Sequence, residues 1–162
     1  MVDLVLLQTA SIAVASAGVL LATVYYTVQI RNQTRMRQTD LLLRLYSQFN
    51  SLQFQEMWHR VLNREIKDYD DRSIEDFVGG DAEATAVGMF FEGIGILLKR
   101  GLIDIDLVDD MFTTPIKWTW EKMRDQTVII RKVRNQPEIL EWFEYLYNKM
   151  QERERKSRIT RE

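Results

Sequence analysis

The chain begins with a long apolar run and then changes to a mixed pattern of apolar and polar positions. Residues 4–30 hold no charged side chain over 27 positions. A helix rises about 1.5 Å per residue, so this run exceeds the length needed to cross the roughly 30 Å hydrocarbon core of a bilayer. The rest of the chain contains no second uncharged run long enough to cross. The pattern therefore predicts one N-terminal transmembrane helix.

Beyond this run, apolar residues recur at helical spacing, and no segment alternates as a strand would. Nothing breaks a helix before Asn50, and Ser51 is expected to cap a second helix. Asp81 is expected to cap a helix that runs from residue 82 to about residue 100. Gly101 is expected to end that helix as a C-cap.

The C-terminal half contains two prolines, and both are expected to start helices. A short helix is expected over residues 102–112, a new one from Thr114-Pro115 and the last one from Pro137. The aromatic side chains of Phe90, Trp120 and Phe143 are expected in the core. The acidic stretch before Asp81 is expected to be a loop.

The predicted fold class is therefore all-α, with the transmembrane helix continuing into a cytoplasmic helical bundle. We expect residues 1–30 to form the anchor, residues 31–155 the bundle and residues 156–162 a charged tail.

The residues that flank the apolar run predict its orientation in a membrane. Aromatic rings gather at bilayer interfaces, and Lys or Arg remains on the cytoplasmic side. The interface residues on the C-terminal side are Tyr25, Tyr26, Arg31, Arg35 and Arg37, whereas Asp3 is the one charge that precedes the run. We therefore expect the N-terminus outside the cell membrane and the C-terminal domain in the cytoplasm. A signal peptide usually has a basic start and a shorter apolar region, and this run has neither.

One face of the predicted membrane helix carries small and polar residues at alternating spacings of three and four. This seam consists of Gln8, Ser11, Ala15, Gly18, Ala22, Tyr25 and Gln29. Small residues let helix backbones approach closely in lipid, where apolar attraction between helices is absent. The seam favours self-association or association with another membrane protein. Two alternatives remain: small residues are common in any membrane helix, and the same stripe in a homo-oligomer is compatible with a pore lining.

Composition excludes several kinds of site. The chain has no cysteine and one histidine, His59, which removes disulfides, thiol nucleophiles and two-histidine metal sites within one chain. The net charge of −2 argues against a nucleic-acid partner. No phosphate-binding loop, nucleophile elbow or zinc-protease motif occurs. The sequence therefore predicts no catalytic residue, no cofactor and no metal ligand.

Two acidic features of the sequence are candidate sites. Asp104, Asp106, Asp109 and Asp110 suggest a divalent-cation loop, but an EF-hand needs Gly at its sixth position and Glu at its twelfth, where this chain has Asp109 and Pro115. Capping of a helix start is the simpler interpretation.

Glu92 lies on a helix face with Gly88 and Gly95, opposite the apolar face. This pattern suggests close approach of another helix, with a cation or a backbone donor meeting the carboxylate. The alternative is an exposed Glu beside incidental glycines.

Three segments carry a resemblance to known sequences: residues 28–63, residues 89–112 and the PEILEWFEYLYNKM segment near the C-terminus. Together they resemble a group of small, uncharacterised prokaryotic membrane proteins with one N-terminal transmembrane helix and a helical cytoplasmic domain of unknown function. The resemblance implies an all-helical soluble domain and a prokaryotic source, and it supplies no catalytic residue.

The combined hypothesis is a single-pass membrane protein that acts as an oligomeric scaffold or accessory subunit through helix–helix contacts. Its expected partners are membrane lipids and either a second copy or another membrane protein. The alternatives are a small homo-oligomeric channel and an enzyme that uses the acidic residues with a divalent ion.

Overall fold

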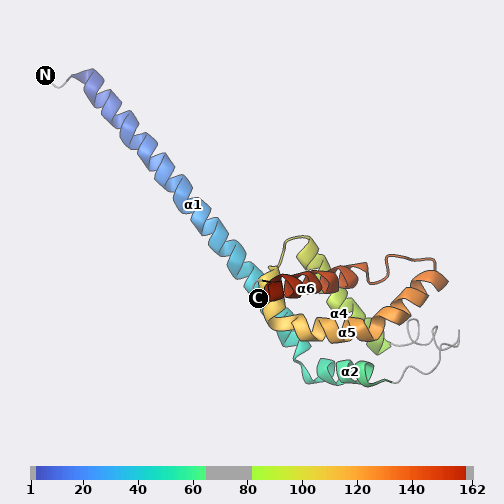
Figure 1. Ribbon diagram of the computed structural model, residues 1–162. Coiled ribbons are helices and arrows are strands. Elements are labelled where there is room, and N and C mark those ends of the chain that lie inside the picture. Colours follow the sequence, from blue (N-terminus) through green and yellow to red (C-terminus); the bar gives the residue numbers. More distant parts are fainter. Residues whose placement is uncertain (1–2, 65–81, 160–162) are drawn as a thin grey trace. The chain divides into compact units, whose positions relative to one another are not determined.

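The computed structural model describes residues 3–64 and 82–159, which are mostly helical (Figure 1). The helices are α1 (Leu4–Phe49), α2 (Leu52–Asn63), α4 (Ala82–Lys99), α5 (Ile105–Val133) and α6 (Glu141–Ile159). No strand occurs in these ranges, so the predicted all-α class is confirmed. The chain divides into two units after Asp40. The acidic stretch and the Asp81 cap lie outside the described residues.

The first unit is the N-terminal part of α1, which is long and apolar enough to span a membrane. Its apolar side chains are exposed: Leu20 is 68% and Leu21 72% accessible. A core helix of a soluble domain would bury such residues, because exposing them to water is unfavourable. The exposed apolar surface of this unit therefore matches the composition of a membrane-spanning helix.

Local capping sets two of the helix boundaries as predicted. The Ser51 hydroxyl accepts a hydrogen bond from the Phe54 N–H at 3.3 Å, which begins α2. Gly101, with φ +67°, ends α4. The N–H groups of Gly101 and Leu102 donate to the carbonyls of Leu98 and Leu97 at 3.0 and 2.9 Å, which is a Schellman motif.

The prediction of a helix start at Thr114-Pro115 is wrong, because α5 continues from Ile105 to Val133 with Pro115 inside it. An interior proline costs about 3 kcal/mol, since it removes one N–H and crowds the preceding turn. The same face of α5 completely buries Phe112 and Ile116, one on each side of the proline. Burial of two such side chains contributes about 1.5–3 kcal/mol each, which offsets the cost of the proline.

The last helix also begins later than predicted, at Glu141 rather than at Pro137. Asn135 ends α5 with φ 51°, and Leu140 precedes α6 with φ 54°. The chain between them forms turns in place of the expected first helical turn. A non-glycine residue at positive φ is uncommon, so the packing around Leu140 must hold it in this conformation.

The second unit has one core to which each of the described helices contributes. Phe49 of α1 lies against Phe90, Phe91 and Phe112, with ring centroids 5.7–6.1 Å apart. The most extensive contact between helices joins α4 to α6. Trp120 and Phe143 are buried as expected, at 4% and 0% exposure. Phe90 is only partly buried, because it lies at the edge of the core beside Phe54.

Candidate functional site

The seam residues all lie on the exposed surface of the first unit. Gln8, Ser11, Ala15, Gly18, Ala22, Tyr25 and Gln29 are each exposed. A Cβ atom added at Gly18 would meet no other heavy atom within 4 Å. The Ser11 hydroxyl donates to the Leu7 carbonyl at 2.8 Å, so its proton is used within α1 and its oxygen remains an acceptor. The face is therefore open for close approach.

Other hydroxyls in this unit are also satisfied by the helix that carries them. Thr23 donates to the Val19 carbonyl at 2.9 Å, and Thr27 donates to the Thr23 carbonyl at 2.7 Å. Such bonds matter in lipid, because no water is present to satisfy a polar group there.

The predicted interface residues follow one another along α1. The rings of Tyr25 and Tyr26 meet edge to face, with centroids 5.7 Å apart, and both are exposed. Arg31, Arg35 and Arg37 are exposed in the next turns of the same helix. The basic residues therefore follow the apolar part of α1 directly.

Glu92 lies where α4 meets the start of α6. Its Oε2 accepts a hydrogen bond from the Phe143 N–H at 2.7 Å, and the residue is 7% exposed. Phe143 is the third residue of α6, where an N-cap side chain usually accepts a hydrogen bond. The residue before α6 is Leu140, whose side chain has no acceptor. A carboxylate from another helix therefore caps α6.

Two glycines of α4 bring this face close to its neighbours. A Cβ atom at Gly95 would overlap the Trp142 carbonyl oxygen and lie 2.5 Å from the carbonyl carbon. A Cβ atom at Gly88 would lie 3.2 Å from side-chain atoms of Leu140 and Met123. The spacing of Gly88, Glu92 and Gly95 thus marks the face of α4 that contacts α6 and the turn before it.

Burial raises the pKa of the Glu92 carboxyl, and the negative charge of Glu141 adds to this shift. The N–H groups of Phe143 and Trp142 and the charge of Arg131 act in the opposite direction but do not cancel it. Because the pKa is higher in the folded state, the folded chain binds this proton more tightly than the unfolded chain.

Replacement of Glu92 by Gln is expected to reduce the pH dependence of stability. The contribution of Glu92 is largest at acidic pH, below its unfolded pKa, and falls as pH rises through the folded value. Gln retains an oxygen acceptor for the Phe143 N–H but does not ionise. The free energy of unfolding of the wild-type chain should therefore fall relative to that of Glu92→Gln as the pH is raised. A constant difference between the two proteins across the pH range would contradict the prediction.

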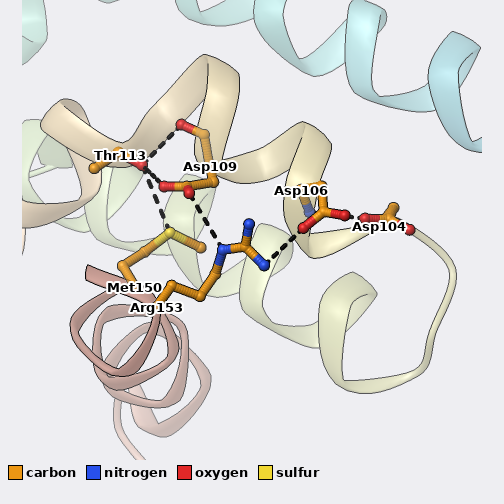
Figure 2. Close-up of polar contacts among 6 residues, drawn as sticks. All are labelled: Asp104, Asp106, Asp109, Thr113, Met150 and Arg153. Carbon is orange, nitrogen blue, oxygen red and sulfur yellow. Dashed lines mark hydrogen bonds and ion pairs between the residues drawn. The ribbon is translucent and has the colours of Figure 1, made fainter. Parts of the chain in front are cut away.

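Asp106 and Asp109 near the start of α5 contact Arg153 of α6, as Figure 2 shows. Asp104 caps α5 by accepting the Asp106 N–H at 2.7 Å. Arg153 Nη1 lies 2.6 Å from Asp106 Oδ1, and its Nε lies 3.2 Å from Asp109 Oδ2. The Thr113 hydroxyl also donates to Asp109. These contacts join α5 to α6, which is a structural role for the cluster.

The part of the chain that the structure describes contains no group of side chains arranged to bind a metal ion. Within residues 3–64 and 82–159, no three His, Cys, Asp or Glu side chains come together as metal ligands. His59 is exposed, and its ring lies 5.2 Å from that of Trp58.

Arg131 is a structural residue that sequence reasoning missed. Its Nε donates to the Ile139 carbonyl at 2.8 Å, and its Nη1 lies 2.6 Å from Glu144 Oε2. Its Nη2 is buried and has no hydrogen-bond partner among the residues that the structure describes. Arg131 thereby ties α5 to the turn before α6 and to α6 itself. No motif marks it, because its partners depend on the positive φ values that reverse the chain after α5.

In the comparison with known families, residues 10–150 match a family model described as a domain of unknown function (DUF4760). The match includes most of α1 and the greater part of the helical unit. No curated protein and no solved structure shows a significant match to the chain.

Proposed function

The chain belongs to the DUF4760 family of domains of unknown function, and on that premise we propose that it is a membrane-anchored scaffold or accessory subunit. In this proposal the N-terminal part of α1 lies in the cell membrane and associates with a second copy through its seam. The helical unit from Leu41 onward is then held at the cytoplasmic surface, where it acts by binding rather than by catalysis.

The observation that carries the proposal is the exposed apolar surface of α1 together with its seam. In lipid, association depends on van der Waals packing, so a face of small residues attracts a partner helix more than a face of large ones. Gly18 and Ala22 belong to the small face, whereas Leu20 and Val24 project from other faces of the helix. The open space around Gly18 is compatible with close packing of a second backbone.

Cysteine cross-linking in membranes tests this association directly. The natural chain contains no cysteine, so each single-cysteine variant has one reactive thiol. Oxidation should convert Gly18→Cys and Ala22→Cys largely to disulfide-linked dimers, because a seam interface places each position near its equivalent in the partner. Leu20→Cys and Val24→Cys are matched controls on the lipid-facing side and should remain monomeric.

Three outcomes would overturn this proposal or redirect it. Equal dimer formation at all four positions would show that the seam does not select the interface. Absence of dimers at every position, with the full-length chain still oligomeric, would move association to the cytoplasmic helices. Rapid labelling of the seam thiols by a water-soluble maleimide in intact membranes would instead indicate a water-lined face, as a channel requires.

The orientation is a separate prediction. A cytoplasmic reporter fused to the C-terminus should be active, and alkaline phosphatase at the same position should be inactive, because Arg31, Arg35 and Arg37 remain on the cytoplasmic side. Replacing all three with Gln should make the orientation mixed, since no other basic cluster lies so close to the apolar run. An active phosphatase fusion on the natural sequence would reverse the proposed topology.

A further inference from the structure

The second unit contains an apolar cavity of about 200 Å³ between the first half of α4, the end of α5 and the turn before α6. Its lining includes the buried residues Ala84, Gly88, Met123 and Ile130. Leu140 adds a partly buried side chain. The cavity opens to solvent on one side, because Met89, Arg134 and Gln136 in its lining are exposed.

The cavity has the size of a small ligand. An apolar cavity of about 150 Å³ accommodates benzene, so this one has room for a single short alkyl chain and not for a polycyclic lipid. Met89 and Met123 contribute flexible thioether side chains that adapt to the shape of an apolar guest. The Thr127 hydroxyl, also in the lining, donates to the Met123 carbonyl at 2.9 Å and therefore has no proton to offer a ligand.

The positive charge at the cavity indicates that the polar end of a ligand is anionic. Among the described residues that line it, Arg134 is the one charged side chain. Arg134 is exposed, and its guanidinium makes no ion pair with any residue in the described ranges. Its neighbour Arg131, by contrast, is paired with Glu144. The cavity thus combines an apolar interior with one available cation.

We propose that this cavity binds an aliphatic carboxylate, with the alkyl chain against Gly88, Met123 and Leu140 and the carboxylate held by Arg134. The guanidinium presents two parallel N–H donors, which match the two oxygens of a carboxylate. The site lies wholly within the second unit and does not depend on the association of α1.

Occupancy of the cavity is measured as protection of a single thiol from alkylation. The experiment uses the full-length chain reconstituted in phosphatidylcholine vesicles. Met89 lines the cavity and is 57% exposed, so Met89→Cys places a reactive thiol there. Octanoate should slow its alkylation by iodoacetamide at least about tenfold at saturation. Val128→Cys is the matched control, because Val128 is 45% exposed on α5 and does not line the cavity. Its alkylation rate should not change.

The role of Arg134 is tested in the Met89→Cys background. Arg134→Gln should raise the half-protecting concentration of octanoate by about tenfold, because a charge-assisted pair is lost. The same change should leave protection by neutral octanol unaltered. Absence of octanoate protection, equal protection at residues 89 and 128, or an unchanged response in Arg134→Gln would each overturn the proposal.

Discussion

Replacement of Phe143 by alanine is expected to destabilise the helical unit by about 3–5 kcal/mol. The Phe143 ring is completely buried, stacks on Phe91 at 5.0 Å and meets the edge of Trp120 at 5.1 Å. Removing it therefore leaves a cavity at the contact between α4, α5 and α6. Chemical denaturation of the full-length protein, followed by tryptophan fluorescence, measures the loss.

Two control variants separate packing from other effects. The alanine variant retains the backbone N–H of residue 143, so the hydrogen bond to Glu92 can persist and the loss reports on the ring. Leu102→Ala removes a side chain that is 50% exposed and should change stability by less than about 0.5 kcal/mol. A Phe143→Ala loss as small as that of Leu102→Ala would show that the ring is not part of a packed core.

Replacement of Gly95 by alanine is expected to give the second large loss of stability. Its Cβ would overlap the Trp142 carbonyl, which is backbone and cannot rotate away. The two helices must then separate, and overpacking of this kind costs about 1–3 kcal/mol or more. This cost exceeds the gain of about 0.5–1 kcal/mol that alanine brings to a helix interior.

Gly93 provides the matched control in the same helix. A Cβ atom there meets nothing within 4 Å, so Gly93→Ala should stabilise the chain by about 0.5–1 kcal/mol. The two glycine variants should therefore shift the denaturation midpoint in opposite directions. A stabilising effect of Gly95→Ala would mean that α4 and α6 are farther apart than the structure places them.

The features that sequence reasoning predicted correctly depend on local chemistry. Ser51 and Gly101 act through their own side chain or backbone conformation, so the neighbouring residues are enough to identify them. The apolar run of α1 is equally local. The local signal at Pro115 favours a helix start, whereas burial of Phe112 and Ile116 keeps the helix continuous.

The contacts of the candidate site depend on tertiary structure to different degrees. The spacing of Gly88, Glu92 and Gly95 indicated a shared helix face, but the sequence does not name the helix that approaches it. The contacts of Arg131 and Arg134 are even harder to predict from the local sequence. Arg131 lies in the last turn of α5 and Arg134 is its C-cap residue, and the two side chains are the same. Yet Arg131 is paired with Glu144, and Arg134 lines a cavity. Only the path of the chain after Asn135 distinguishes them.

The cap that α6 receives from Glu92 has a consequence for how the unit folds. A helix whose first turn is completed by a residue 51 positions away in the sequence cannot be fully stable as an isolated segment. Its formation is thermodynamically linked to the docking of α4. The C-terminal helix should therefore gain and lose its structure together with the rest of the unit, in a single cooperative transition.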